Sequence, residues 1–426
     1  MTVRATARIR PSQAPGRLTG LFGAVTLAEH RQRYGPLPAA DGPALIDAVR
    51  RAGLRGRGGA GFPTGRKLAA VAAGRRPVVV ANGCEGEPAS AKDRTLLGNA
   101  PHLVLDGAVL AARAVGAARV VLCVHRGSPR AQALAQAVAS RPADGVAVEV
   151  AQVPRRYVAS EESALVHFLN DGEARPTSVP PRPFEKGVGG RPTLVDNVET
   201  LAHLALIAAG GPDWFRQLGT DSDPGTSLVT MAGAVAHPAI HEISLGVPLG
   251  QVIELAGGPA QELSAVLVGG YFGAWVPVRA AYRLPLSHDT PPGGGPALGA
   301  GALVALPAAA CGLAETSRVF SYLAYESAGQ CGPCQFGLPA VADQLRLLAA
   351  GRLDPVGYRR LTSRLQVIAG RGACRHPDGA VRFAASGLAV FEDDVRAHLR
   401  GYPCAGVRYP AVLPVPHPRQ IDGGWR

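Results

Sequence analysis

A chain of 426 residues, with a net charge of +12 and 7 cysteines, is long enough for two or three domains. The cysteines are too few for a disulfide framework, and the longest apolar run, residues 299–313, is interrupted by Pro307 and too short to span a bilayer. The opening stretch MTVRATARIR lacks the apolar segment of a secretory signal, so the sequence predicts a reducing, cytoplasmic setting.

The positive charge comes almost wholly from arginine, since Lys67, Lys92 and Lys186 are the only lysines. Dispersed arginine is typical of a nucleic-acid surface, of contact with an acidic partner protein, or of a phosphate-bearing ligand. No stretch interleaves basic with stacking aromatic residues, as a single-strand binder would, so nucleic acid is not expected as a partner. Most of these arginines are expected to form a solvated surface.

The first half of the chain alternates short β-branched runs with helical patterns. Residues 43–56 predict a helix that runs into a glycine turn. Strands are predicted at 75–82, 118–127 and 145–154, and helices between them at 101–116 and 129–140. Strands that alternate with helices indicate an α/β layer with a largely parallel sheet.

In the second half of the chain, the sequence pattern changes twice. Residues 226–306 contain strand-like runs with glycine punctuation around one short helix, which predicts a small β-rich module. Amphipathic patterns that predict a small helical domain follow at 317–330, 337–351, 356–372 and 387–402. The tail after Tyr409 is rich in proline and glycine and is expected to be loosely held.

The stretch GLRGRGGAGFPTGRK, residues 53–67, is the most informative motif. Its six glycines allow close approach of the backbone to a ligand and expose successive N–H groups, and Arg55, Arg57, Arg66 and Lys67 add positive charge. That combination suits a phosphate, although it matches neither a P-loop nor a standard dinucleotide fingerprint. A generic flexible loop is the alternative.

Three further polar clusters lie at the ends of predicted elements. Asn82, Glu85 and Glu87 come at the end of an apolar strand, where ligands bind in open α/β sheets; a charged surface turn is the competing interpretation. The pair Glu161 and Glu162 opens an apolar helix, where helix capping alone would explain them. The cluster of Asp196, Asn197, Glu199 and Thr200 precedes another helix and is equally explained by N-capping.

These motifs occur together, in this order, in one known family. The glycine loop, NGCEGEPASAKDR, YVASEESAL and GRPTLVDNVETL resemble the flavin-bearing, NADH-oxidising F subunit of respiratory complex I and the diaphorase subunits of NAD-linked hydrogenases and formate dehydrogenases. The resemblance covers about residues 40 to 400. It implies an α/β fold with an FMN-binding α/β domain, followed by a β-grasp (SLBB-like) module and a C-terminal helical iron–sulfur-binding bundle. The implied boundaries are 1–222, 223–310 and 311–408, with a tail at 409–426.

The resemblance also implies cofactors and their residues. FMN would lie against the glycine loop and the polar strand end, and NADH would stack on the flavin, with its adenine near Phe62. Hydride transfer to the flavin and one-electron steps to an iron–sulfur cluster would follow, because the cofactors carry the chemistry and the protein positions them. The cofactor-binding residues implied in this way are Gly56, Arg57, Gly58, Gly59, Phe62, Lys67, Asn82, Glu85, Glu87, Glu161, Glu162 and Asn197.

Cysteines Cys331, Cys334 and Cys374 match three of the family's four cluster ligands. Ala328 stands where the family has its first cluster cysteine. Three cysteines can hold a 4Fe-4S cluster with another group on one iron, a 3Fe-4S cluster, or nothing stable, and His376 or, less directly, Cys404 is a candidate fourth ligand. Zinc is a rival occupant of three thiolates and a histidine, and a redox pair of cysteines lacks the expected surrounding fold.

The flavin region also departs from the family pattern. Cys84 replaces an aspartate, Ala159 a cysteine, Asp196 an asparagine and Ala70 an aromatic residue. These changes leave FMN in place and weaken the case for NADH. Two alternatives to an NADH dehydrogenase therefore stay open. One is a flavoprotein that exchanges electrons with ferredoxin-like carriers without NADH, and the other is a non-catalytic scaffold subunit of the same fold.

The resemblance further implies a partner subunit that accepts electrons, of a ferredoxin-like or 2Fe-2S kind. No transmembrane segment is expected. The implied location is the cytoplasm, with attachment to a membrane only through partner subunits.

Overall fold

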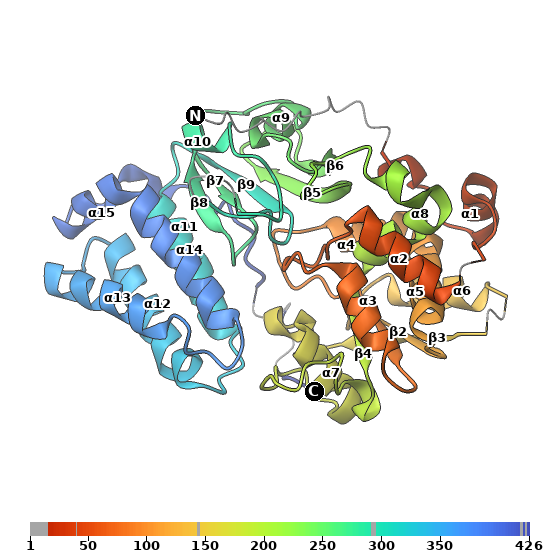
Figure 1. Cartoon of the computed structure of the whole chain (residues 1–426). Coiled ribbons are helices and arrows are strands. Elements are labelled where there is room, and N and C mark those ends of the chain that lie inside the picture. The colour runs from red at the N-terminus through yellow and green to blue at the C-terminus, as the bar shows by residue number, and fades with distance from the viewer. Residues whose placement is uncertain (1–15, 40, 143–144, 291–294, 418–420, 422–423) are drawn as a thin grey trace, which may run out of the picture.

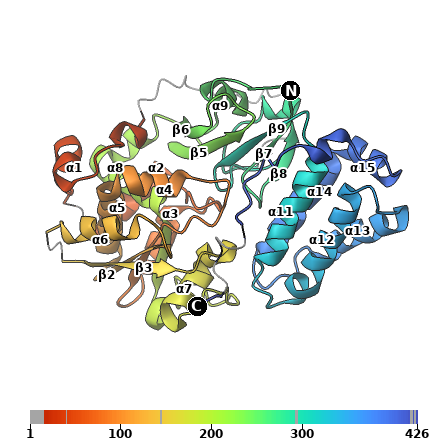
Figure 2. The same ribbon diagram turned by 180° about the vertical axis from the view of Figure 1, so that it is seen from behind.

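The computed structural model describes residues 16–39, 41–142, 145–290, 295–417, 421 and 424–426. An α/β domain and a helical bundle lie on opposite sides of a five-stranded sheet (Figures 1 and 2). This arrangement confirms the predicted fold class. The domain boundaries themselves stay predictions.

The α/β domain is built on a four-stranded parallel sheet. Its strands are β1 (Val78–Asn82), β2 (Arg119–His125), β3 (Ala147–Val153) and β4 (Thr193–Asn197), in the order β3-β2-β1-β4. Alternate side chains of β1 enter different hydrophobic clusters, Val79 and Ala81 on one face and Val78 and Val80 on the other. A continuous apolar strand is therefore required, because helices cover both faces of the sheet.

Helices surround this sheet, and five of them lie at positions that the sequence predicts. They are α1 (Leu27–Tyr34), α2 (Gly42–Ala52), α3 (Thr64–Ala72), α4 (Lys92–Asn99), α5 (Pro101–Val115), α6 (Ala131–Ala139), α7 (Glu162–Asp171) and α8 (Val198–Phe215). Gly107 lets α5 approach α8 closely, because a Cβ there would lie 1.8 Å from the Leu201 carbonyl oxygen. The close packing fixes α8, and with it the end of β4 from which α8 starts.

The central module has the β-grasp strand order β6-β5-β9-β7-β8. Its elements are β5 (Thr226–Gly233), β6 (Ala239–Ser244), α9 (Leu249–Leu255), β7 (Leu263–Val268), β8 (Ala274–Pro277), α10 (Val278–Ala281) and β9 (Ala302–Pro307). Leu267 of β7 packs into the core of the helical bundle, whereas its neighbour Val266 packs toward α9. The module is thus buried on both faces and joins the other two parts.

The bundle contains α11 (Gly312–Tyr325), α12 (Leu338–Ala349), α13 (Pro355–Ile368), α14 (His376–Val390) and α15 (Glu392–Leu399). The prediction of one helical segment over 387–402 is wrong, because the chain leaves the helical conformation at Phe391, with φ −103° and ψ 36°. Three acidic residues in the first turn of α15 favour a new helix start there, through their interaction with the helix dipole.

The described part of the C-terminal tail is held by specific contacts, contrary to the expectation of a loose tail. Glu315 of α11 accepts the Leu413 N–H at 2.8 Å, and the Ala174 N–H donates to the Trp425 carbonyl at 2.7 Å. The tail therefore runs from the bundle back to the α/β domain, and the C-terminus lies beside α7 (Figure 1). Among the described residues, no helix has the length and apolar character needed to cross a membrane.

Candidate functional site

Polar side chains gather where β1 and β4 end. These strands are neighbours, and Asn82 pairs in register with Asn197 at their last positions. Because β2 and β3 lie on the other side of β1, this edge is the point where the strand order reverses. Ligands of open parallel sheets bind at such a point, outside the carboxyl ends of the strands.

The two asparagines hold the strand ends in a fixed shape. Asn82 donates from Nδ2 to the Ser160 carbonyl at 2.9 Å and accepts the Cys84 N–H at 3.1 Å. Asn197 caps α8, because its Oδ1 accepts the Glu199 N–H at 3.0 Å. N-capping is thus part of the role of Asn197, as one interpretation of the sequence expected, and it places the residue at the ligand edge.

The glycine loop forms a tight lobe between α2 and α3. The Gly56 N–H donates to the Phe62 carbonyl at 2.8 Å and closes the lobe at its base. At its tip Gly58 faces the strand ends, since a Cβ there would lie 3.5 Å from the Asn197 Cβ. The N–H groups of Gly58 and Gly59 find no hydrogen-bond acceptor within the described ranges. The lobe can therefore donate to a phosphate, as the glycine spacing predicts.

Arg57 has a different side-chain role from the predicted one. The residue is 1% exposed, and its guanidinium donates to the carbonyls of Thr226 at 3.2 Å and Arg55 at 3.2 Å. Its backbone N–H donates to the Thr200 hydroxyl at 2.8 Å. Burial, the larger influence, lowers the pKa of Arg57, and the charges of Asp223 and Glu199 oppose that shift. The side chain thus ties the glycine lobe to the start of β5 and does not extend toward a ligand.

Lys67, on α3, supplies the positive charge that lies at the strand ends. Its Nζ donates to the Val195 carbonyl at 2.8 Å and lies 3.4 Å from Asp196 and 3.7 Å from Glu162. Burial pulls the pKa of Lys67 down, but Asp196 and Glu162 more than offset it, so the pKa is above its ordinary value. The ammonium therefore stays charged and can attract an anionic ligand.

Glu85 and Glu87 have separate surroundings although both follow β1. Glu85 Oε1 accepts the Ser90 hydroxyl at 2.5 Å and the Asp93 N–H at 3.1 Å, which anchors the start of α4. Glu87 is buried and accepts the Tyr157 hydroxyl at 3.0 Å and the Tyr271 N–H at 2.7 Å. Burial raises the pKa of Glu87 to about 7, despite the hydrogen bonds that favour its ionised form.

Glu161 and Glu162 also differ from each other. Glu161 caps α7, since it accepts the N–H groups of Ser163 at 2.9 Å and Ala164 at 3.1 Å, and burial raises its pKa. Glu162 is half-exposed beside Lys67. The capping interpretation of Glu161 is therefore correct, and only Glu162 is shown beside Lys67 at the edge of the sheet.

Phe62 stands at the rim of the glycine lobe. Its side chain is 45% exposed, and the Arg66 guanidinium lies 5.9 Å from its ring centroid. An exposed aromatic ring beside a cation is suited to stacking on a heterocycle. The surroundings of Phe62 thus agree with the adenine contact that the resemblance implies.

A buried charged network behind the strand ends was not predicted as such from the sequence. Lys92 Nζ lies 2.6 Å from Asp93 and 2.9 Å from Glu199, and Asn197 donates to Asp93 at 2.7 Å. Burial, the larger influence on Lys92, lowers its pKa, but the two carboxylates raise it overall. The motif KDR contained the signal, because a lysine and an aspartate at a strand-to-helix junction need charged partners when they are buried.

The residues that depart from the family pattern are accommodated in the fold. Burial raises the pKa of the Cys84 thiol well above its ordinary value, so this residue is neutral where a carboxylate is typical. Ala159 is fully buried. Asp196 is also buried and is the nearer carboxylate partner of Lys67, so the replacement of an asparagine adds a charge that Lys67 balances.

Cys331, Cys334 and Cys374 converge at one end of the bundle. Burial first, then the neighbouring Cys331 and Cys374, raise the pKa of Cys334 to about 12. Cys334 lies in a turn of π-helix at Pro333–Gly337, and Cys374 lies in the loop before α14. Three thiols from these two segments, which act electrostatically on one another, could bind three irons of an iron–sulfur cluster. The remaining cysteines of the described ranges lie elsewhere, Cys84 and Cys123 in the core of the α/β domain and Cys311 beside Cys404.

The two candidate fourth ligands have other surroundings. His376 is buried, its Nε2 bonds to the Leu323 carbonyl at 2.8 Å, and its Nδ1 has no hydrogen-bond partner among the described residues. Its role as an iron ligand stays a prediction. Cys404 instead lies beside Cys311 and His398, at a separate place in the bundle.

Residues 326–337, which follow α11 and contain Cys331 and Cys334, are named the cluster loop. The first residue of this loop is anchored on the α/β domain. Glu326 Oε2 accepts the Tyr157 N–H at 2.6 Å, and Glu326 Oε1 lies 3.2 Å from Arg156. Glu161 also acts electrostatically on Cys374. These contacts were missed from the sequence, because they join segments far apart in the chain.

A glycine lobe and lysine at the switch point of a parallel sheet, next to three gathered thiols, define the class of flavin- and iron–sulfur-dependent oxidoreductases. Two family models match the chain: the Nuo51 FMN-binding domain at residues 49–206 and the NADH-ubiquinone oxidoreductase-F iron-sulfur binding region at residues 314–398. The matched regions contain the glycine lobe and the three cysteines.

Whole proteins of known type are similar over most of the chain. The F 2 subunit of the NADH-quinone oxidoreductase of Rhizobium meliloti is 30% identical over 84% of this chain and 90% of its own length. The F subunit of the Streptomyces coelicolor enzyme is 32% identical over 84% of each chain. A chain of the NAD+-reducing NiFe hydrogenase, in its air-oxidised state, superposes with a TM-score of 0.82 and 32% identity, over 93% of this chain and 68% of that one.

The chain belongs to the family of NADH-quinone oxidoreductase F subunits. The predicted FMN-binding domain and iron–sulfur-binding region are confirmed, and NADH as the substrate fits the family. The roles of individual site residues stay predictions.

Proposed function

We propose that this chain oxidises NADH at an FMN held against the carboxyl ends of β1 and β4, and passes the electrons singly through the three-cysteine site to a partner protein. The observation that carries the proposal is the junction between the two sites. Glu326, in the cluster loop, binds Tyr157 and Arg156, and Glu161 at the head of α7 acts on Cys374. A short separation between donor and acceptor groups is what one-electron transfer needs.

The bound flavin supplies the ability to accept a hydride and to release electrons one at a time. The chain supplies position and charge. The lobe N–H groups and Lys67 would hold the phosphate, and Asn82 and Asn197 would orient the polar edge of the ring system. Glu87, Glu161 and Glu162 would line the nucleotide pocket, with Phe62 on the adenine.

The partner is inferred from the surface beside the cluster loop. A groove begins at Phe336, two residues after Cys334, and we name it the arginine groove. Its lining includes Phe336, Val356, Arg359, Arg360, Arg364 and Val367. Phe336 is 70% exposed and Val367 54% exposed. Exposed apolar side chains surrounded by arginines suit an acidic protein surface, so we propose a ferredoxin-like electron carrier as the partner.

The proposed location follows from the partner and not from a membrane anchor. A cytoplasmic chain of this family would reach a membrane only through partner subunits.

Reductive titration tests the proposal. The chain is reconstituted under anaerobic conditions with FMN, iron and sulfide, and its absorbance is recorded during addition of NADH. Bleaching of the flavin at micromolar NADH, followed by loss of iron–sulfur absorbance, is the expected result. A bound flavin that only an artificial reductant bleaches would contradict NADH oxidation, and failure to retain any chromophore would favour a scaffold role.

Two lysine substitutions test the flavin site, one at a lysine inside the site and one at a lysine outside it. Lys67→Ala removes the charge at the strand ends, whereas Lys186→Ala removes an exposed lysine outside the site. A charge-assisted hydrogen bond contributes about 1.5 to 3 kcal/mol, so FMN affinity should fall by about 10- to 100-fold in Lys67→Ala. Equal FMN affinity in the two variants would remove Lys67 from the proposed phosphate site.

A further inference from the structure

We propose that Cys311, His398 and Cys404, with Asp394, form a second metal site in the bundle, suited to a divalent ion such as Zn²⁺. This site is separate from the three-cysteine site and plays no part in the proposed electron path. The proposal rests on geometry that joins three different segments of the chain.

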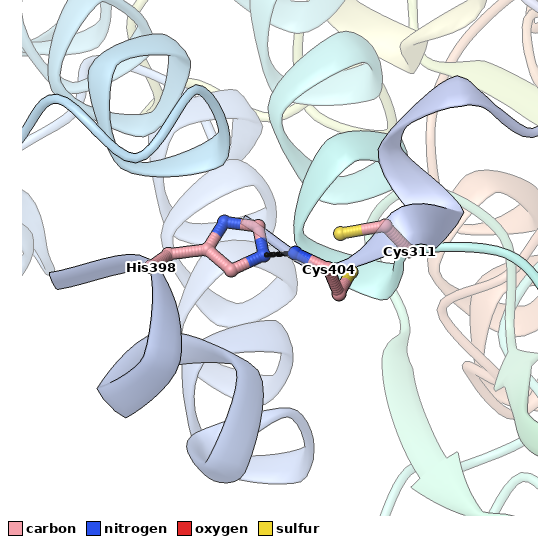
Figure 3. Close-up of side chains that lie close together, drawn as sticks. All are labelled: Cys311, His398 and Cys404. Atoms are coloured by element: carbon pink, nitrogen blue, oxygen red, sulfur yellow. Dashed lines mark hydrogen bonds between the residues drawn. The ribbon is translucent and has the colours of Figure 1, made fainter. Parts of the chain in front are cut away.

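The three ligand atoms lie within 4.8 Å of one another. Cys311 caps the start of α11, His398 lies in the last turn of α15, and Cys404 precedes a short 3-10 turn (Figure 3). Tetrahedral zinc has bonds of about 2.3 Å to sulfur and about 2.0 Å to nitrogen, which place neighbouring ligand atoms about 3.5 to 3.8 Å apart. The side chains need to close by only about 1 Å to bind such an ion.

The imidazole of His398 is oriented as in a metal ligand. Its Nδ1 bonds to the Leu348 carbonyl at 3.1 Å, which makes Nδ1 the donor and leaves Nε2 with its lone pair. A hydrogen bond from the remote nitrogen to a backbone carbonyl is the usual support of a ligating histidine. Nε2 now accepts the Cys404 N–H at 3.0 Å, so the lone pair already points to the Cys404 segment (Figure 3). On metal binding, His398 Nε2 would lose the hydrogen bond from the Cys404 N–H and bind the ion instead.

Asp394 is the proposed fourth ligand, although its carboxylate lies outside the group of three atoms that are within 4.8 Å of one another. It lies one helical turn before His398 on α15, so the two side chains share one face of the helix. Its carboxylate acts electrostatically on Cys311 and is itself influenced by His398. Two sulfurs, one nitrogen and one carboxylate oxygen form a donor set that zinc accepts.

The two thiols lie close enough to share one ion. Cys311 is buried, and its Sγ lies within 4.8 Å of the Cys404 Sγ. Zinc binding would replace the two S–H protons, so one Zn²⁺ enters, two thiolates form and two protons leave to solvent, with no change of oxidation state.

The position of the site gives it a structural role. The Cys311 N–H donates to the Gly406 carbonyl at 3.1 Å, so the start of α11 and the segment after Cys404 already lie side by side. An ion here would join α11, α15 and the origin of the tail. The helix α11 has 14 residues and is about 20 Å long, and the cluster loop follows its far end. The two sites therefore lie at opposite ends of α11.

A disulfide between Cys311 and Cys404 is the competing outcome. Two thiols alone would suit it, but it would require neither the oriented imidazole of His398 beside them nor a carboxylate on the same face of α15. The histidine and the aspartate therefore favour the metal.

Cobalt titration tests the proposal, because Co²⁺ replaces Zn²⁺ and absorbs light when thiolates bind it. Two of the three cluster cysteines are first replaced in the full chain by Cys331→Ser with Cys334→Ser, which leaves a single cluster thiol and keeps the proposed site intact. We expect one Co²⁺ per chain with thiolate-to-cobalt charge-transfer absorption, displaced by Zn²⁺, and a rise of the melting midpoint with Zn²⁺.

Further substitutions in the same cluster-cleared chain assign the ligands. Cys404→Ala should abolish the charge-transfer absorption and the Zn²⁺-dependent rise of the melting midpoint. Asp394→Asn, which leaves the buried residues in place, should weaken Zn²⁺ binding by at least about 10-fold. Absence of thiolate–cobalt absorption in the cluster-cleared chain, with circular dichroism like that of the unmodified chain, would overturn the proposal. A Cys311–Cys404 disulfide that forms in air in a chain that takes up no metal after reduction would also overturn it.

Discussion

The buried carboxyl of Glu87 makes stability depend on pH in a direction opposite to that of most acidic residues. Its pKa is raised from 4.5 to about 7, mainly by burial. Between these pH values the folded chain keeps the proton while the unfolded chain has lost it, so the free energy of unfolding falls as pH rises. We expect a contribution of at most about 3 kcal/mol over this range. Denaturant unfolding at a series of pH values measures it.

In Glu87→Gln, this loss of stability with rising pH should disappear. The substitution itself should change the free energy of unfolding by an amount that is the same at every pH. Glu254→Gln, at an exposed position on α9, is the control and should keep the slope of the unmodified chain. If Glu87→Gln and the unmodified chain lose stability in parallel between pH 4.5 and about pH 7, Glu87 is not the group that titrates.

Ala328 determines how many irons of the cluster have a cysteine ligand. Three thiolates fix three irons of a cubane, and the fourth iron is easily lost when no residue binds it. Ala328→Cys should raise the iron content of the reconstituted chain from about three to about four per chain and slow its loss in air. Iron analysis and EPR spectra of the oxidised and reduced chain measure both effects.

Ala324→Cys is the matched control for this change, because it adds a thiol on α11 and not in the cluster loop. It should leave the iron content as in the unmodified chain. Equal iron and identical EPR spectra in Ala328→Cys and the unmodified chain would mean that another residue, such as His376, already completes the site.

At the scale of elements, strong periodicities made most of the fold predictable. The apolar run of β1 is short but uninterrupted and the apolar pattern of α5 extends over 15 residues, and tertiary contacts reinforce the structures that they favour. The break at Phe391 was not predicted, since helical periodicity continues across it, although the acidic residues at 392–394 are a sequence signal for a new helix start.

For the candidate site, the sequence predicted where several residues lie along the predicted elements, but not which residues they contact. Asn82 was expected at the end of a strand, whereas β4 was not predicted and only the family resemblance placed Asn197 at the same FMN site. The inward turn of Arg57 and the anchoring of Glu326 on Tyr157 depend on contacts between distant segments, which no local pattern contains.

The arginine groove between α12 and α13 should control the rate of electron transfer to an acidic carrier. Arg359→Glu with Arg364→Glu reverses two charges of its lining while the apolar side chains remain. Because electrostatic steering raises association rates by about 10-fold or more, the second-order rate with a ferredoxin should fall by at least about 10-fold at low salt. Stopped-flow reduction at increasing ionic strength should also show a weaker salt dependence in the variant.

Arg279→Glu, on the exposed side of α10, is the control for that experiment. It changes the net charge in the same direction away from the groove and should have a much smaller effect. Comparable losses in the control and in the groove variant would indicate a general charge effect, with no specific docking at the arginine groove.

At the scale of the whole molecule, the tail acts as a strap across the two cofactor regions. The Trp425 ring lies 4.3 Å from the Arg156 guanidinium and 5.5 Å from that of Arg175. Arg156 in turn pairs with Glu326 at the head of the cluster loop. A single aromatic ring thus supports the arginine that connects the α/β domain to the bundle.

Trp425→Ala should therefore loosen both sides of this junction. Cation–π contacts of this kind contribute about 0.5 to 2 kcal/mol, so we expect a fall of about 1 to 2 kcal/mol in the free energy that opens the junction. Hydrogen exchange should become about 5- to 30-fold faster in the amides of α7 and in the loop that follows Glu326, while the core of β1 keeps its protection. Tyr402→Ala, which removes a side chain that is 74% exposed, is the matched control and should leave both regions unchanged. Faster exchange in α7 alone would mean that the tail supports the α/β domain but does not stabilise its contact with the cluster loop.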